Sequence, residues 1–162
     1  MLKGYDLRKE SRSFLLTLKG ISGVPVVDTA ILGNDKAQGS VQGAKHSLEY
    51  YMTLFNRDIG TTGSFYGRTY RSTNALPIRE TTGSWDSNTE EYVYFHTSYT
   101  EKTSFAVIEC VLVRDLVGQK TYSSCGYGLC SIFDFAGVTS IELNRGSPRA
   151  IGLGGLDAAA KG

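Results

Sequence analysis

The alternation of hydrophobic and polar positions along this chain is typical of β-strands. Apolar side chains recur at every second position, as they do where one face of a strand is buried. Turn-forming Gly, Asn, Asp and Pro residues separate these stretches at near-regular spacing. The pattern predicts an all-β protein, an antiparallel β-sandwich of about eight strands. The expected strands are 13–19, 24–32, 46–56, 65–70, 91–96, 104–114, 127–133 and 138–144.

Segment 104–114 carries the strongest strand pattern of the chain. One face would present Ala106, Ile108, Cys110 and Leu112, and the other Phe105, Val107, Val111 and Val113. Both faces are therefore expected to be covered, which places this strand in the middle of a sheet between two layers. Only Glu109 interrupts the second face. The short connection 99–103 predicts a hairpin-like return from the preceding strand.

Segment 46–56 permits two interpretations. A strand would bury Leu48, Tyr50, Met52 and Leu54, whereas a helix would place Leu48, Tyr51, Met52 and Phe55 on one stripe. We favour the strand because aromatic residues are enriched in strands. The helix remains the alternative.

Glycine and proline positions set the expected ends and edges of the strands. Gly20 should end the first strand, and Pro25 should lie at a sheet edge because proline cannot donate a ladder hydrogen bond. Gly67 allows a bulge in its strand. Loops are expected at 34–44 and at 76–88, which includes Trp85.

A chain of 162 residues has the length of one domain. We expect a polar lead-in at 1–12, a single β-sandwich domain at 13–151 and a Gly/Ala tail at 152–162. The buried core should contain Phe14, Leu16, Leu18, Leu48, Tyr50, Met52, Leu54, Phe105, Val107, Ile108, Val111, Leu112, Leu129 and Ile132.

Composition and charge exclude several classes of protein. Apolar residues make up 41% and charged residues 20% of the chain, as in ordinary globular proteins. The net charge of +1 gives no reason to expect nucleic acid or an anionic membrane as a partner. The apolar runs are too short to span a bilayer. An odd number of cysteines and the lack of an apolar leader indicate an intracellular, cytoplasmic protein with reduced thiols.

The residues that carry most enzymatic and metal chemistry do not form a recognisable set. The chain has two histidines, His46 and His96, and neither lies beside a Gly-x-Ser-x-Gly sequence. Cys125 and Cys130 have four residues between them instead of two, and on a strand they should point to opposite faces. The glycine-rich stretches lack the Lys-Ser or Lys-Thr of a phosphate-binding loop. We therefore expect no enzymatic activity, no metal and no cofactor.

Two weaker binding interpretations concern charged residues in loops. A calcium site is not expected because the loop aspartates are isolated, namely Asp58, Asp86, Asp115 and Asp134. Three arginines, Arg68, Arg71 and Arg79, could form a patch for an acidic partner, but a solvated face is the favoured interpretation.

Four motifs, in this order along the chain, resemble the nephrocystin-4 (nephroretinin) family. The motifs are 65–70 (FYGRTY), 94–98 (YFHTS), 124–129 (SCGYGL) and 145–150 (RGSPRA), and the resemblance covers about residues 48–151. It implies a C2-domain-like β-sandwich that corresponds to the N-terminal region of the family. The family proteins are long, so this chain is either a fragment or a short relative.

The resemblance also implies a function. It points to a non-enzymatic scaffold or protein-interaction module of cilia or flagella, at the transition zone, basal body or axoneme. Other ciliary or axonemal proteins would be the partners, with tubulin a candidate. The alternative is a C2-type domain that binds membranes in response to lipid or calcium.

The motif residues that we expect to matter for structure or interaction are Phe65, Gly67, Arg68, Phe95, His96, Cys125, Gly126, Gly128, Gly146, Pro148 and Arg149. Glycines in strands mark bulges, positive φ or close approach of another segment. A proline such as Pro148 fixes a turn. Arg68 and Arg149 would either brace backbone carbonyls, which we favour, or contact a partner carboxylate.

Overall fold

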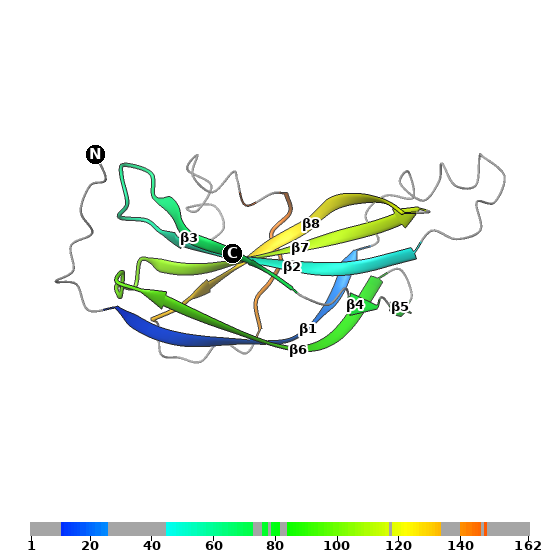
Figure 1. Ribbon diagram of the computed structural model, residues 1–162, viewed down its shortest axis with the longest axis horizontal. Coiled ribbons are helices and arrows are strands. Elements are labelled where there is room, and N and C mark those ends of the chain that lie inside the picture. Colours follow the sequence, from blue (N-terminus) through cyan, green and yellow to red (C-terminus); the bar gives the residue numbers. More distant parts are fainter. Residues whose placement is uncertain are drawn as a thin grey trace.

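The computed structural model describes residues 11–25, 45–72, 76–77, 79–81, 84–116, 118–133, 140–146 and 148 (Figure 1). Within these ranges the chain forms strands and no α-helix, which confirms the all-β prediction. None of the described residues therefore belongs to a helix long and apolar enough to cross a membrane. The strands are β1 Arg12–Pro25, β2 Lys45–Asn56, β3 Ser64–Arg71, β4 Leu76–Pro77, β5 Arg79–Thr81, β6 Ser84–Thr97, β7 Ser104–Leu116 and β8 Gln119–Ser131.

The strands form two antiparallel sheets that pack face to face. The first sheet has the order β1-β6-β5, and the second has the order β3-β2-β7-β8, with the short β4 also paired to β2. Figure 1 shows β1 and β6 on one side of the molecule and β2, β7 and β8 on the other. The architecture is that of a β-sandwich, as expected from the sequence.

Strand β7 lies in the centre of the five-stranded sheet. It pairs with β2 on one side, from Lys45↔Asp115 to Asn56↔Ser104, and with β8 on the other. Side chains on both of its faces are buried, because Ala106 is 0% and Val107 is 2% exposed. The prediction that this strand would be covered on both faces is confirmed.

Strand β2 confirms the strand interpretation of segment 46–56. Its four expected core residues are at most 2% exposed: Leu48, Tyr50, Met52 and Leu54. Phe55 is fully buried on the opposite face, against Phe65 of β3 at a centroid distance of 5.1 Å. A bulge in β3 lies opposite β2, between Tyr66 and Tyr70, and Gly67 adopts φ +75° there. The bulge expected at Gly67 is thus present.

Strand β1 is longer than the sequence indicates. It continues past Gly20 to Pro25, with irregular register between Leu18 and Gly20 and between Ile21 and Val24. Glycine did not end the strand because the ladder to β6 resumes after the irregularity. Pro25 does lie on an edge strand, since β1 pairs with β6 alone.

The core between the sheets joins side chains from both layers. Met52, Leu54, Ala106 and Ile108 of the larger sheet pack with Val93 and Phe95 of the smaller one. Eight of the fourteen expected core residues are buried, and Phe14, Leu16, Leu18, Phe105, Leu129 and Ile132 are half-buried. The three β1 residues are less covered than expected because their strand is an edge.

Two connections differ from the sequence prediction. The segment 76–88, expected to be a loop, contributes β4, β5 and the first part of β6, in which Trp85 pairs with Val24. The turn-forming residues of this segment predict a loop, but its backbone pairs with β1 and β2 and within the smaller sheet. The connection 99–103 is not a hairpin return, because β6 and β7 belong to different sheets.

The C-terminal part also differs. Strand β8 starts at Gln119, well before the expected residue 127. No strand is present in the described part of 138–144, where Asn144 makes only an isolated bridge with Tyr127. The alternating Ile141 and Leu143 instead pack into the core between the sheets. Predictions for 34–44 and for the tail lie outside the described residues.

We expect Leu112→Ala to lower the free energy of unfolding by ~2–5 kcal/mol, because it empties space in a closely packed core. Leu112 is 5% exposed, and Ile108, at 6%, should respond in the same way. Leu15→Ala is the matched control, since Leu15 is 47% exposed and its truncation should cost less than ~0.5 kcal/mol. Urea denaturation measures the free energy of unfolding of both variants. Equal losses would contradict the placement of Leu112 between the two sheets and of Leu15 on the outer surface.

Candidate functional site

A C-terminal segment, residues 140–146 with Pro148, attaches to the outer edge of β8; we call it the strap. The backbone N–H of Asn144 donates to the carbonyl of Tyr127 at 2.7 Å, and the return hydrogen bond is 3.0 Å long. The Ser124 hydroxyl donates to the carbonyl of Gly146 at 3.3 Å. Gly146 itself has φ +96°, which only glycine adopts readily. These bonds fix the strap along the sheet edge.

The strap wraps around this edge from one face of the sheet to the other. Ile141 and Leu143 pack on the core side, whereas Pro148 is buried beside Val107 and Glu109, whose side chains lie on the outer face of β7. The orange segment in Figure 1 follows this course past the larger sheet. The predicted motif that contains Gly146 and Pro148 therefore closes the edge of the sandwich.

Two of the predicted glycines make room for the strap. A Cβ atom on Gly128 would lie 2.7 Å from Cγ2 of Ile141, and one on Gly126 would lie 2.7 Å from the carbonyl oxygen of Asn144. Both distances are shorter than real Cβ contacts. The SCGYGL motif thus serves close approach of the strap, which is one of the roles expected for its glycines.

The cysteines are arranged differently from the prediction. Cys125 sits at a bulge, because Gly126 pairs with Cys110 and Ser124 with Val111. Both Cys125 and Cys130 therefore reach the core side of the sheet, and the expected opposite faces are wrong. All three thiols are free. A hydrogen bond with Cys125, together with burial, raises the pKa of the Cys110 thiol.

The strap forms one wall of a groove on the outer face of the five-stranded sheet. The groove has a volume of about 250 Å³. It is lined by Tyr51, Thr53, Phe65, Thr69, Val107, Glu109 and Pro148. The hydroxyls of Thr53 and Thr69 hydrogen-bond to each other at 2.9 Å. Glu109 is the charged residue among those that line the groove. Phe65 and Pro148, both predicted motif residues, line this groove.

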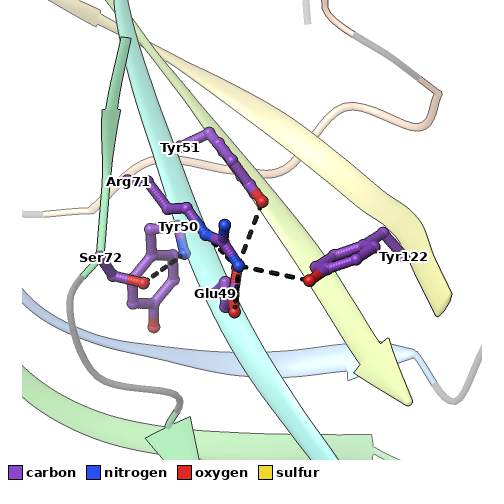
Figure 2. A network of polar contacts seen from close by, with 6 residues as sticks. All are labelled: Glu49, Tyr50, Tyr51, Arg71, Ser72 and Tyr122. Atoms are coloured by element: carbon purple, nitrogen blue, oxygen red, sulfur yellow. Dashed lines mark hydrogen bonds and ion pairs between the residues drawn. The ribbon is translucent and has the colours of Figure 1, made fainter. Parts of the chain in front are cut away.

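A charged cluster adjoins the groove through Tyr51 (Figure 2). The guanidinium of Arg71 donates to both carboxylate oxygens of Glu49, at 2.7 and 2.9 Å. The same guanidinium lies 5.7 Å from the ring centre of Tyr51 and 5.6 Å from that of Tyr122. The bidentate geometry and the two rings hold the Arg71 side chain in one orientation.

The cluster changes the acidity of its members. The hydrogen bonds from Arg71 hold the pKa of the Glu49 carboxyl below its usual value, although burial of Glu49 opposes this. Burial raises the pKa of Tyr51. Glu49 is therefore an anion at neutral pH, paired with a fixed cation, and the pair stabilises the outer face of the sheet.

The remaining predicted residues are distributed over both sheets. Phe95 is buried and stacks on Phe14 at 5.3 Å, whereas His96 is exposed on the outer face of the smaller sheet. Arg68 is exposed, and its side chain makes no hydrogen bond to another described residue, so its expected bracing role stays a prediction. Arg149 lies outside the described residues.

No group of three or more His, Cys, Asp or Glu residues that could hold a metal ion occurs among the described residues. What the outer face offers instead is a small groove with one carboxylate and aromatic walls.

The sequence pattern does not predict this surface. It favours a solvated face for Arg71 and gives no sign that Glu49, Tyr51 and Glu109 lie together. The register joins them, since Tyr51 pairs with Arg71 on one side and with Glu109 on the other. The one signal in the sequence was Glu109, a charge within an otherwise apolar strand face.

Comparison with known proteins finds a similarity to nephrocystin-4 of Xenopus laevis. The two sequences are 33% identical over an alignment of 114 residues, and the match covers 65% of this chain and 8% of the length of that protein. The similarity supports a relationship between this chain and part of nephrocystin-4. No family model matches the chain, and no solved structure matches it.

We expect Gly128→Ala to lower the free energy of unfolding by ~1–3 kcal/mol, because the new methyl group collides with Ile141. The double variant Gly128→Ala with Ile141→Ala removes the colliding atom. Its loss should be smaller than the sum of the two single losses, by at least ~0.5 kcal/mol. Additive losses in chemical denaturation would show that Gly128 does not act through the strap.

The Glu49–Arg71 pair should make stability depend on pH. Because the pKa of Glu49 is lowered in the folded state, its contribution is present near pH 7 and is lost as the pH falls through that lowered pKa. The Glu49→Gln variant should therefore melt at a lower temperature than the parent at pH 7. This difference in melting temperature should become smaller at pH 3. Glu101→Gln, an exposed change, is the control. A difference in melting temperature that does not change with pH would show that the ion pair does not contribute to stability.

Proposed function

We propose that this chain is a non-enzymatic protein-interaction module that acts as a scaffold in cilia or flagella. The observation that carries the proposal is an exposed aromatic surface on the outer face of the β1-β6-β5 sheet. Leu15, Tyr92 and Tyr94 are 47%, 51% and 73% exposed there. We call these three residues the aromatic face.

The register of β1 and β6 gathers the aromatic face into one patch. Leu15 lies directly opposite Tyr94, and Thr17 lies opposite Tyr92. Directly opposed residues on one face of a sheet have neighbouring side chains. Exposed His96, opposite Ser13, extends the same face. Contiguous exposed apolar and aromatic groups mark surfaces that bind other proteins, and tyrosine is enriched among the residues that dominate binding energy.

The ciliary setting of the proposal rests on the similarity to nephrocystin-4. We infer that the chain corresponds to an N-terminal, C2-like module of that family, located in the cytoplasm at the transition zone, basal body or axoneme. Its partners would be other ciliary or axonemal proteins, with tubulin a candidate. The same inference gives it no enzymatic activity and no cofactor.

We expect the double variant Tyr92→Ser and Tyr94→Ser to lose its ciliary partners without unfolding. Both rings are exposed, so the melting temperature should change little. Proximity labelling in ciliated cells should fall at least about tenfold for the main partner, as for aromatic residues at the centre of an interface. Fluorescence microscopy should place the parent chain at the base or along the shaft of the cilium.

Tyr122→Ser is the matched control, because Tyr122 is 49% exposed but belongs to the other sheet. It should keep the labelling of the parent. Equal labelling by the double variant and the parent would refute the aromatic face as the interaction surface. Calcium-dependent flotation of the purified chain with liposomes would instead favour the C2-type membrane-binding alternative.

A further inference from the structure

We propose that the groove beside the strap binds a lysine or arginine side chain of a partner polypeptide. This site lies on the sheet opposite the aromatic face and goes beyond the proposed function. Its ligand is defined by the charge, the size and the apolar walls of the groove.

The charge of the groove comes from Glu109. This residue is half-buried, between the buried Val107 and Val111 on the same face of β7. Neither a hydrogen bond nor an ion pair reaches its carboxylate from the described residues. Both Glu49 oxygens hold the Arg71 guanidinium, which forms no ion pair with Glu109. Among the described residues, the Glu109 carboxylate therefore has no counterion.

The other lining residues suit the stem of a long basic side chain. Tyr51, Phe65, Val107 and Pro148 provide aromatic and aliphatic walls. Lysine and arginine bury such stems along apolar surfaces while the charged head reaches a polar group. A cation over the Tyr51 ring would gain further attraction, as the guanidinium of Arg71 already does at 5.7 Å.

The size of the groove favours one side chain over a larger ligand. Its volume is about 250 Å³, below the roughly 300–1,000 Å³ of sites that enclose drug-sized molecules. The two threonines, Thr53 and Thr69, satisfy each other and demand no polar partner. A single stem with a terminal positive charge meets these conditions.

The position of the groove favours a polypeptide over a free amine. The groove opens on the outer face of the sheet, from Phe65 and Thr69 of β3 to Glu109 of β7. A partner chain that crosses the strands on this face places one basic side chain over Glu109, while its neighbouring residues contact the exposed rim at Phe65.

The test uses a blocked pentapeptide, acetyl-Val-Val-Lys-Val-Ser-amide, its arginine counterpart and its norleucine counterpart. Titration of the isotopically labelled chain, followed by nuclear magnetic resonance, should shift the amide signals of residues 51–53, 65–69 and 107–109. The dissociation constant should be at least about tenfold lower for the basic peptides than for norleucine, because the buried charge pair is lost with norleucine. The advantage should shrink in high salt.

Variants of the chain complete the test. Glu109→Gln keeps the size of the side chain and should remove the advantage of the basic peptides, whereas Glu101→Gln, on an exposed turn, should keep it. Melting curves check that both variants fold. Equal affinity for lysine and norleucine peptides, shifts confined to other surfaces, or full binding by Glu109→Gln would each overturn the proposal. None of these outcomes depends on the ciliary assignment, so the two proposals fail separately.

Discussion

The structure depends on one constraint, which is that the central strand β7 must be covered on both faces. The smaller sheet covers the side of Ile108 and Cys110, but no second sheet covers the side of Val107. Phe55, Tyr127 and their neighbours bury Val107 on that face, and Pro148 of the strap lies beside it. The two faces of β7 are therefore covered in different ways, one by a sheet and the other by single side chains and part of the strap.

The unequal coverings explain why the two outer surfaces differ in chemistry. The smaller sheet turns Tyr92 and Tyr94 outward with little above them, and so presents a broad aromatic patch. The larger sheet is partly covered, and its uncovered remainder is a narrow groove next to a neutralised ion pair. A broad apolar patch suits a folded partner, whereas a narrow charged groove suits a single side chain.

The sequence predicted the fold where burial sets the pattern. Leu48 to Leu54 and the two apolar faces of β7 alternate because both segments are buried, and these predictions are confirmed. It failed where backbone pairing or packing acts without that pattern. The polar start of β6 is a strand because its backbone pairs with β1. Ile141 and Leu143 alternate because they pack against the surface of β8 without being part of a sheet. Cys125 changed face because a bulge shifts the period of two. The groove was not predictable, since it needs the register of three strands.

The strap also determines how many neighbours the larger sheet can accept. Over residues 124–128 it occupies the β8 edge, while β3 keeps its outer backbone groups unpaired within the described part of the molecule. A closed stretch of sheet edge cannot accept a further strand, whereas an open edge can. Two copies joined through β3 would form a two-fold symmetric pair, because each copy would cover the open edge of the other. In such a pair the strap would keep the middle of each β8 edge closed to a third chain.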